Sequence, residues 1–198
     1  MHIGLDRMSS GSGYSGTESY KYIEPLLRER GSRLIVVSPY ISPDYARIIV
    51  REAGKRSVYV LTSEASRGAS QGEAIRILQS TRRLSRRYVA IMAYLSLLLA
   101  TSLVIHSYYL ALLVASVMMA FSVVLLSTSR SPGRYLHLKI AGPNFVHEKL
   151  YISDTKAIVG SANLTYSGLH RNVEHIEIIR DGARRRELIA HFESLWRE

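Results

Sequence analysis

Short apolar runs, typical of buried strands, alternate with amphipathic segments along most of the chain. The run Leu34–Val37, closed by Pro39, has no polar position and predicts a strand buried on both faces. Further strands are predicted at 57–63, 135–142, 149–153, 157–161 and 173–180. Helices are predicted at 17–31, 44–56, 71–88 and 183–198. This mixture of strands and helices predicts an α/β fold, a mixed sheet flanked by helices.

The two ends of the chain differ in apolar content. Residues 1–16 are mostly small and polar, without the apolar core of a secretory signal, and we expect them to form a flexible arm. The helix predicted at 183–198 carries an apolar stripe that consists of Leu188, Ile189, Phe192, Leu195 and Trp196. Such a stripe predicts that this helix packs against the rest of the domain.

One stretch interrupts the alternation of strands and helices. Residues 88–129 contain no Asp, Glu, Lys or Arg, and a transmembrane helix needs roughly 20 apolar residues to cross about 30 Å of hydrocarbon. The stretch holds two such lengths, 88–105 and 108–126, separated by a break whose tyrosines suit a lipid–water interface. We therefore expect a transmembrane helical hairpin that interrupts one domain. The predicted division of the chain is a flexible arm at 1–16, the first half of the domain at 17–87, the hairpin at 88–127 and the second half of the domain at 128–198.

Arginines on both sides of the hairpin predict its orientation. They are Arg82, Arg83, Arg86 and Arg87 before it and Arg130 and Arg134 after it. Positive residues at both ends favour a membrane protein whose α/β domain and both termini are cytoplasmic. The alternative is a pair of buried core helices in a soluble protein, but core helices usually carry a polar face, which neither segment has. The short break also permits a shallower, re-entrant hairpin.

Composition narrows the choice of partners. The chain has 26 Lys and Arg against 16 Asp and Glu, and its formal charge of +10 favours anionic partners such as nucleic acid or an acidic lipid surface. It contains no Cys, which excludes disulfides, thiol nucleophiles and Cys-ligated zinc. Carboxylates and histidines do not cluster at metal-ligand spacing in the sequence, so neither a metal nor a cofactor is expected.

The segment 147–165 concentrates the polar chemistry. His147 and Lys149 are two residues apart, so on a strand both point to the same face. The next polar landmarks are Asp154 at the end of the strand, Gly160 and Ser161 after the returning strand, and Asn163 in the following turn. An ammonium supplies charge, and a hydroxyl and an amide supply directional donors, so these groups could converge on a phosphate. An imidazole can attack phosphorus or protonate a leaving oxygen near neutral pH.

This arrangement resembles the signature of the phospholipase D superfamily, His-x-Lys-(four residues)-Asp followed by Gly-Ser-x-Asn. The spacing from Asp154 to Gly160 is one residue shorter than in many members. The runs 34–42 and 58–63 resemble the first strands of the family, and 172–178 resembles the strand that follows its motif. The resemblance implies a phosphodiesterase in which one histidine forms a phosphohistidine, while a second protonates the leaving oxygen and then activates water.

The family builds its site from two motifs, and this chain has one. It therefore resembles the single-motif members, which complete the site as homodimers, so that His147 of each subunit would take one of the two roles. The resemblance implies phosphate binding by Lys149, Ser161, Asn163 and Asn172, and catalytic roles for His147, Lys149, Asp154 and Glu174. Within that set, Glu174 is similar to the acid that orients the nucleophile, although a surface strand residue would fit its spacing equally well, and Asp154 is expected to support the site. Among the other histidines, His137, His170 and His175 are interpreted as structural or solvated.

Three hypotheses for the function remain open: a nuclease, a phospholipid hydrolase and a catalytically silent binding module. Single-motif relatives are often endonucleases, and a basic chain suits a polyanion, which favours DNA or RNA. A hydrolase of phospholipid headgroups would profit from the high effective concentration of lipid at the membrane. A catalytically silent module that binds nucleic acid or lipid is the third, and the intact His147, Lys149 and Asn163 set argues against it.

Overall fold

The computed structural model describes residues 11–64, 69–80, 94–95, 135–142 and 147–197. The predicted transmembrane hairpin, 88–127, lies outside these residues apart from 94 and 95, and it stays a prediction. Among the described residues, no helix combines the length and the apolar character that a bilayer crossing requires. On either side of that segment, the described residues include a helix that reaches residue 80 and the strand β4, Leu136–Ala141.

The predicted α/β fold is confirmed, because the described strands form one mixed sheet of seven strands in the order β1-β7-β6-β5-β2-β3-β4. The strands are β1 Gly11–Gly16, β2 Arg33–Val37, β3 Ser57–Ser63, β4 Leu136–Ala141, β5 Leu150–Ile152, β6 Ala157–Gly160 and β7 Glu174–Ile179. The pairs β2–β3 and β3–β4 are parallel, and the other four are antiparallel. All strands predicted from the sequence are present with ends within a few residues of those expected.

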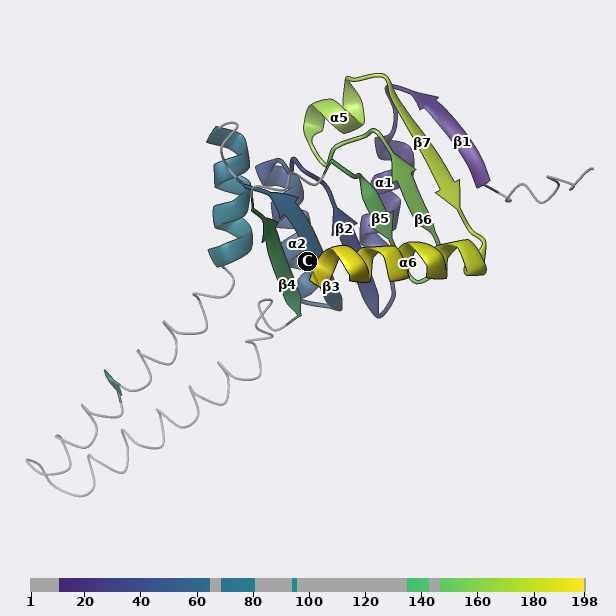
Figure 1. Cartoon of the computed structure of the whole chain (residues 1–198). Helices are drawn as coiled ribbons and strands as arrows, with labels where there is room; N and C mark the ends of the chain where they lie inside the picture. Colours follow the sequence, from purple (N-terminus) through teal and green to yellow (C-terminus); the bar gives the residue numbers. More distant parts are fainter. Residues whose placement is uncertain (1–10, 65–68, 81–93, 96–134, 143–146, 198) are drawn as a thin grey trace, which may run out of the picture.

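Helices cover both faces of this sheet (Figure 1). They are α1 Tyr20–Arg28, α2 Pro43–Ala53, a helical segment at 69–80, α5 Tyr166–His170 and α6 Gly182–Arg197. Helix α2 ends at Ala53, with Gly54 as its C-cap, close to the end predicted. Pro25 lies inside α1 without interrupting it, and the helix ends at Arg28, before Gly31. The short α5 was not expected, because five residues are too few for a helical hydrophobic period to show in the sequence.

The buried side chains form two hydrophobic clusters, one on each face of the sheet, because successive residues of a strand point to opposite faces. On one face, side chains such as Val36, Val60 and Tyr151 pack with α1, α2, α5 and the 69–80 segment. On the other face, Leu150 and Ile152 pack with α6, through the stripe Leu188, Ile189, Phe192, Leu195 and Trp196 that the sequence predicted for docking. The face that a motif residue occupies is therefore fixed by the phase of the buried residues beside it.

The predicted flexible arm is wrong for residues 11–16, which form the edge strand β1. This strand pairs antiparallel with β7 from Gly11 opposite Ile179 to Gly16 opposite Glu174. Its composition of Gly, Ser and one Tyr gives no apolar alternation, so the sequence offers no strand signal. Pairing with the exposed edge of β7 supplies the hydrogen bonds that the composition does not predict. Residues 1–10 lie outside the described part of the chain.

Candidate active site

The polar residues of the motif meet at one edge of the sheet. Strands β5, β6 and β7 are successively antiparallel, so the start of β5, the end of β6 and the start of β7 share an edge. We call it the motif edge; the residues on it are His147 and Lys149 before β5, Ser161 and Asn163 after β6, and Asn172 and Glu174 at β7. Strands β2 and β3 end at this edge, since Val37 lies opposite Leu150 in an antiparallel pair.

Lys149 is buried beside the exposed His147. Its ammonium nitrogen Nζ lies 3.2 Å from Nδ1 and 3.3 Å from Nε2 of His147, and it donates a hydrogen bond to the carbonyl oxygen of His147 at 2.6 Å. Burial lowers the pKa of Lys149 below its ordinary value of 10.5, and the negative charge of Glu174 opposes that shift. The pair thus places an imidazole at the surface and a cation directly behind it.

Glu174 is a buried carboxylate with both oxygens engaged. The hydroxyl of Ser161 donates to Oε2, and the amide of Asn172 donates to Oε1 at 3.2 Å. Ser161 also accepts a hydrogen bond from the backbone amide of His175 at 3.0 Å. Ser161, Asn172 and Glu174, all predicted site residues, are therefore joined in one hydrogen-bond network with Glu174 at its centre. The carboxylate of Glu174 also interacts electrostatically with the ammonium of Lys149.

Gly160 permits the close approach of strands that this network needs. A Cβ built at this position would lie 2.1 Å from the carbonyl oxygen of His175 and 2.8 Å from the Cα of Ile176. Such contacts are far inside van der Waals distance, so only glycine fits. The absence of a side chain lets Ser161 donate its backbone amide to His175 at 2.9 Å and bring its hydroxyl to Glu174.

The turn that carries Asn163 is tied to the end of β2. The hydroxyl of Ser38 accepts from the amide of Leu164 at 3.0 Å, and Leu164 forms an isolated parallel bridge with Ile41. The phenol of Tyr151 donates to the carbonyl of Ala162 at 2.8 Å. The side-chain oxygen of Asn163 is buried and has no hydrogen-bond partner in the described ranges of the chain. A buried acceptor of this kind can be satisfied by a donor from a water molecule, a ligand or another chain.

Asp154 does not lie at the motif edge with the other predicted site residues, and its catalytic role stays a prediction. It follows β5, so the length of that strand separates it from His147, roughly 20 Å of near-extended chain. Its Oδ2 accepts from the backbone amide of Ser32 at 2.5 Å and from the Ser32 hydroxyl at 3.0 Å. Burial alone would raise the pKa of Asp154, but the Ser32 hydrogen bonds and the charge of Arg56 lower it overall. Asp154 therefore joins the end of β5 to the start of β2.

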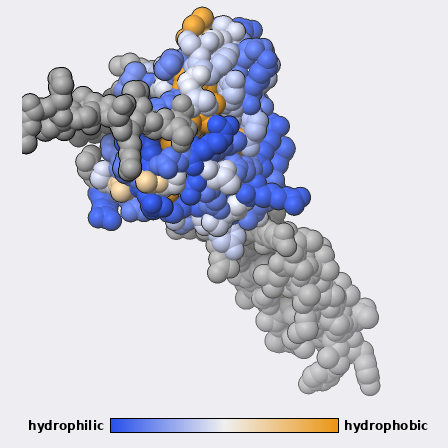
Figure 2. Space-filling view, turned by 90° about the vertical axis from the view of Figure 1, so that its right-hand side faces the viewer, coloured by the Kyte–Doolittle hydropathy of each residue, from blue (hydrophilic) through white to orange (hydrophobic). Residues whose placement is uncertain are grey.

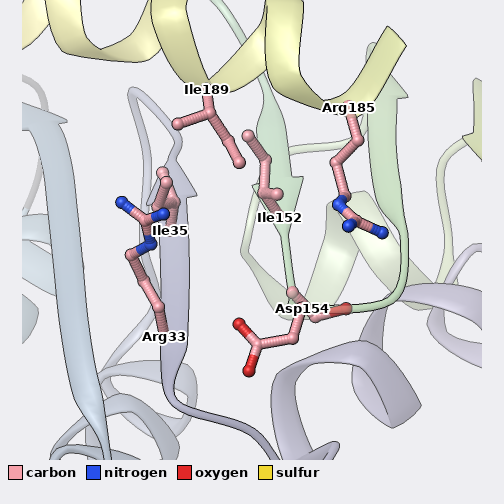
Figure 3. A pocket seen from close by; sticks show the side chains of 7 residues that line it. Arg33, Ile35, Ile152, Asp154, Arg185 and Ile189 are labelled. Carbon is pink, nitrogen blue, oxygen red and sulfur yellow. The ribbon is translucent and has the colours of Figure 1, made fainter. Parts of the chain in front are cut away.

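A pocket of about 240 Å³ marks this opposite edge of the sheet. Arg33 and Arg185 flank it, Ile189 of α6 lies above it, and Asp154 lies at one end (Figure 3). A second pocket, of about 300 Å³, adjoins Lys149 and Gly160 on the α6 side of the motif edge. Of these two pockets, the second lies next to the residues that the motif gathers.

Some supporting residues were not singled out in the sequence. Ser38 and Tyr151 fix the turn around Asn163, and Tyr151 could have been found from its strand phase, which it shares with His147 and Lys149. Gln71 is also buried, and its amide bonds to the carbonyls of Pro39 and Ser63. A lone glutamine at the start of a helix carries no signal for that role.

A mixed sheet that gathers a His-x-Lys pair, a Gly-Ser turn and a buried glutamate at one edge defines a phospholipase D-like domain. The family described as "Cardiolipin synthase, PLD-like domain" matches residues 26–196. The chain therefore belongs to this family, as the resemblance of the motif predicted.

Solved structures agree with this fold. The chain is similar to a phospholipase D family member, Nuc from Salmonella typhimurium, at 12% identity and a TM-score of 0.57, with 95% of each chain covered. It is also similar to NucT from Helicobacter pylori, at 12% identity and a TM-score of 0.53, covering 95% of this chain and 96% of that chain. No curated protein sequence matches the chain significantly.

Proposed function

We propose that the chain is a membrane-anchored phosphodiesterase that hydrolyses nucleic acid in a site shared between two copies. The observation that carries the proposal is the buried Lys149 ammonium behind the exposed imidazole of His147, beside the Ser161–Glu174–Asn172 network. A cation held in place before the substrate arrives can stabilise the negative charge that develops on a phosphoryl group. The imidazole at the surface is accessible to a phosphodiester.

In the proposed reaction, His147 of one copy attacks phosphorus and a P–N bond forms. The bond from phosphorus to the leaving oxygen breaks, and His147 of the second copy gives its proton to that oxygen. Water then attacks the phosphohistidine, the second imidazole takes a proton from this water, and a phosphomonoester leaves. Lys149 stays protonated throughout, because its role is to neutralise charge on the phosphoryl oxygens.

Two features support a site completed by a second copy. One chain supplies a single His-x-Lys pair, whereas the reaction needs one imidazole as nucleophile and another as acid. The buried side-chain oxygen of Asn163 also accepts no hydrogen bond in the described part of this chain, and a donor from a ligand or from the second copy would satisfy it. A two-fold axis through the motif edge would bring the two sets of groups to the same phosphate.

The positions of the described residues that flank the predicted membrane hairpin favour nucleic acid over phospholipid. The described chain resumes at Tyr135, whose carbonyl accepts from the amide of Val58 at the start of β3, the edge opposite the motif edge. The helix at 69–80 begins beside the end of β3, through Gln71 and Ser63, and runs away from α5 (Figure 1). The last described residue before the predicted hairpin in the sheet-covering helix, residue 80, and the first after it, Tyr135, thus lie away from the motif edge. If the hairpin spans the bilayer, the motif edge faces water.

The proposal is tested with the full chain purified in detergent. Wild type is expected to cleave labelled single-stranded DNA or RNA, with or without a chelator, and His147→Ala is expected to lose at least about a thousandfold of that activity. Quenching with detergent at alkaline pH during turnover, where a phosphohistidine is stable, should trap label on wild type but not on His147→Ala. His137→Ala is the matched control, since His137 lies at the start of β4, at the edge opposite the motif edge, where its ring stacks on Tyr59.

Other outcomes would redirect or overturn this proposal. Headgroup release from phospholipid without strand cleavage would identify a lipid hydrolase, and turnover of neither substrate would identify a binding module. Full activity from a strictly monomeric species would contradict the shared site. Anchoring is tested separately: the chain should stay in the membrane fraction after an alkaline carbonate wash, and release by that wash would contradict it.

A further inference from the structure

Three aromatic rings stack beside the motif edge. The ring of His170 in α5 lies between two tyrosines, with centroids 4.4 Å from Tyr20 and 4.7 Å from Tyr166 and interplanar angles of 14° and 18°. Near-parallel rings at these distances form a continuous stack. The stack joins the start of α1 to α5, which follows the turn that carries Asn163.

The middle ring of this stack is fixed by hydrogen bonds. Nε2 of His170 lies 3.0 Å from the phenol oxygen of Tyr45 and 3.3 Å from a carboxylate oxygen of Glu24. Tyr45 is buried and donates to the same carboxylate at 2.8 Å. Burial and the bond to Glu24 raise the pKa of Tyr45, so its hydroxyl keeps its proton. The stack is therefore ordered before any ligand binds.

The outer end of the stack reaches solvent, and there Arg171 lies over the ring of Tyr166. Tyr166 is 52% exposed although it is a large aromatic residue. The guanidinium carbon of Arg171 lies 5.2 Å from the centroid of its ring, within cation–π range. Val173 at the same end of the domain is 75% exposed, and Figure 2 shows hydrophobic atoms at that end of a mostly hydrophilic surface.

This outer end borders the candidate active site. Arg171 precedes Asn172, whose amide bonds to Glu174. Tyr166 is three residues from Asn163, a span of at most about 11 Å between Cα atoms. Helix α5 packs on the same face of the sheet as Lys149, because Leu169 belongs to the cluster that contains Tyr151, the strand-phase neighbour of Lys149. Tyr166 and Arg171 therefore flank Asn163 and Asn172, two of the residues assigned to phosphate binding.

We propose that Tyr166 and Arg171 form a base-stacking subsite for the nucleotide that flanks the scissile phosphate. The inference rests on the proposed phosphodiesterase function. It further requires a nucleic-acid substrate in which at least one base beside the scissile phosphate is unstacked. Because Arg171 lies over the ring of Tyr166, a base would stack on the guanidinium plane, or on the ring itself when Arg171 turns to bind the next phosphate. Both kinds of stacking tolerate every base, because each base has a π-face. A choline or ethanolamine headgroup gains less here, since Arg171 repels its positive charge.

The test compares Tyr166→Ala with Tyr166→Phe and with Tyr135→Ala in the full chain. Tyr135 is 42% exposed at the opposite edge and is a matched control. Tyr166→Ala should raise KM for a single-stranded oligonucleotide roughly tenfold with little change in kcat, and Tyr166→Phe and Tyr135→Ala should leave it unchanged. An oligonucleotide with an abasic site at the flanking position should show no difference between wild type and Tyr166→Ala.

A binding readout separates this subsite from the catalytic proposal. An oligonucleotide with 2-aminopurine at the flanking position should lose fluorescence on binding to wild type and keep it with Tyr166→Ala. Quenching that depends on Tyr166 without cleavage would support the subsite and reject the phosphodiesterase. Cleavage by wild type with an unchanged KM in Tyr166→Ala would reject the subsite alone. Dissociation of a dimer in Tyr166→Ala would also reject it, because the ring would then belong to the subunit interface.

Discussion

Ser161 and Glu174 hold the end of β6 to the start of β7 through a hydrogen bond from hydroxyl to carboxylate. The two residues are thirteen apart in sequence, and they meet because Gly160 leaves room for His175. The second carboxylate oxygen of Glu174 accepts from Asn172. The site therefore depends on the buried Glu174 as a positioning residue, whereas the proposed chemistry takes place at the exposed imidazole of His147.

Replacement of Glu174 by Gln is expected to lower kcat/KM by roughly ten- to a hundredfold. The introduced side-chain amide would present a donor where Ser161 or Asn172 now donates, so one buried hydrogen bond would be lost. The lost negative charge would also lower the pKa of Lys149 further. Steady-state kinetics should show this decrease, whereas Glu177→Gln on the same strand should not.

The pH profile of kcat/KM should have an alkaline limb that reports Lys149. Burial lowers the pKa of Lys149 below 10.5, and the proposed role needs the protonated form, so activity should fall as pH rises through that lowered pKa. In Glu174→Gln the limb should move to still lower pH, because the opposing charge is gone. Lys156→Met at the other edge should leave the limb in place. An unshifted limb in Glu174→Gln would contradict this assignment.

Replacement of Asp154 by Asn should affect stability and leave the chemistry largely intact. We expect a loss of about 1 kcal/mol in the free energy of unfolding at pH 7, a small value because solvent screens this exposed carboxylate. The pKa of Asp154 is lowered in the fold, so its contribution is present above the unfolded pKa of about 3.9 and lost as pH falls through the folded pKa. Urea titrations should show the two proteins converging in acid. A thousandfold loss of activity in Asp154→Asn would instead restore a catalytic role.

Replacement of Gly160 by Ala should be severely destabilising. The added Cβ would lie 2.1 Å from the carbonyl oxygen of His175, and backbone atoms cannot yield as a side chain can. We expect a cost of about 3 kcal/mol or more, measured by thermal or urea unfolding. Gly142→Ala is the control, because a Cβ there would meet no atom within 4 Å, and its effect should stay within about 0.5 kcal/mol.

The strands with continuous apolar runs, such as Leu34–Val37 and Ser57–Ser63, were predictable because burial on both faces demands that composition. The phase of His147 and Lys149 followed from strand alternation. Strand β1 was not predictable, since Gly and Ser carry no burial signal and its pairing comes from β7. The position of Asp154 follows from its partner Ser32, 122 residues away in sequence, which no local pattern encodes.

The two halves of the domain share their sheet in an interleaved order. Strands β1, β2 and β3 of the first half pair with β7, β5 and β4 of the second, so three of the pairs cross between the halves. Neither half holds its strands in one uninterrupted block. Proteolytic cleavage between residues 80 and 135 would therefore yield two fragments that remain associated through backbone hydrogen bonds. Co-expression of such fragments should reconstitute the folded domain, and a long insertion at this point costs the fold little more than the entropy of closing a longer loop.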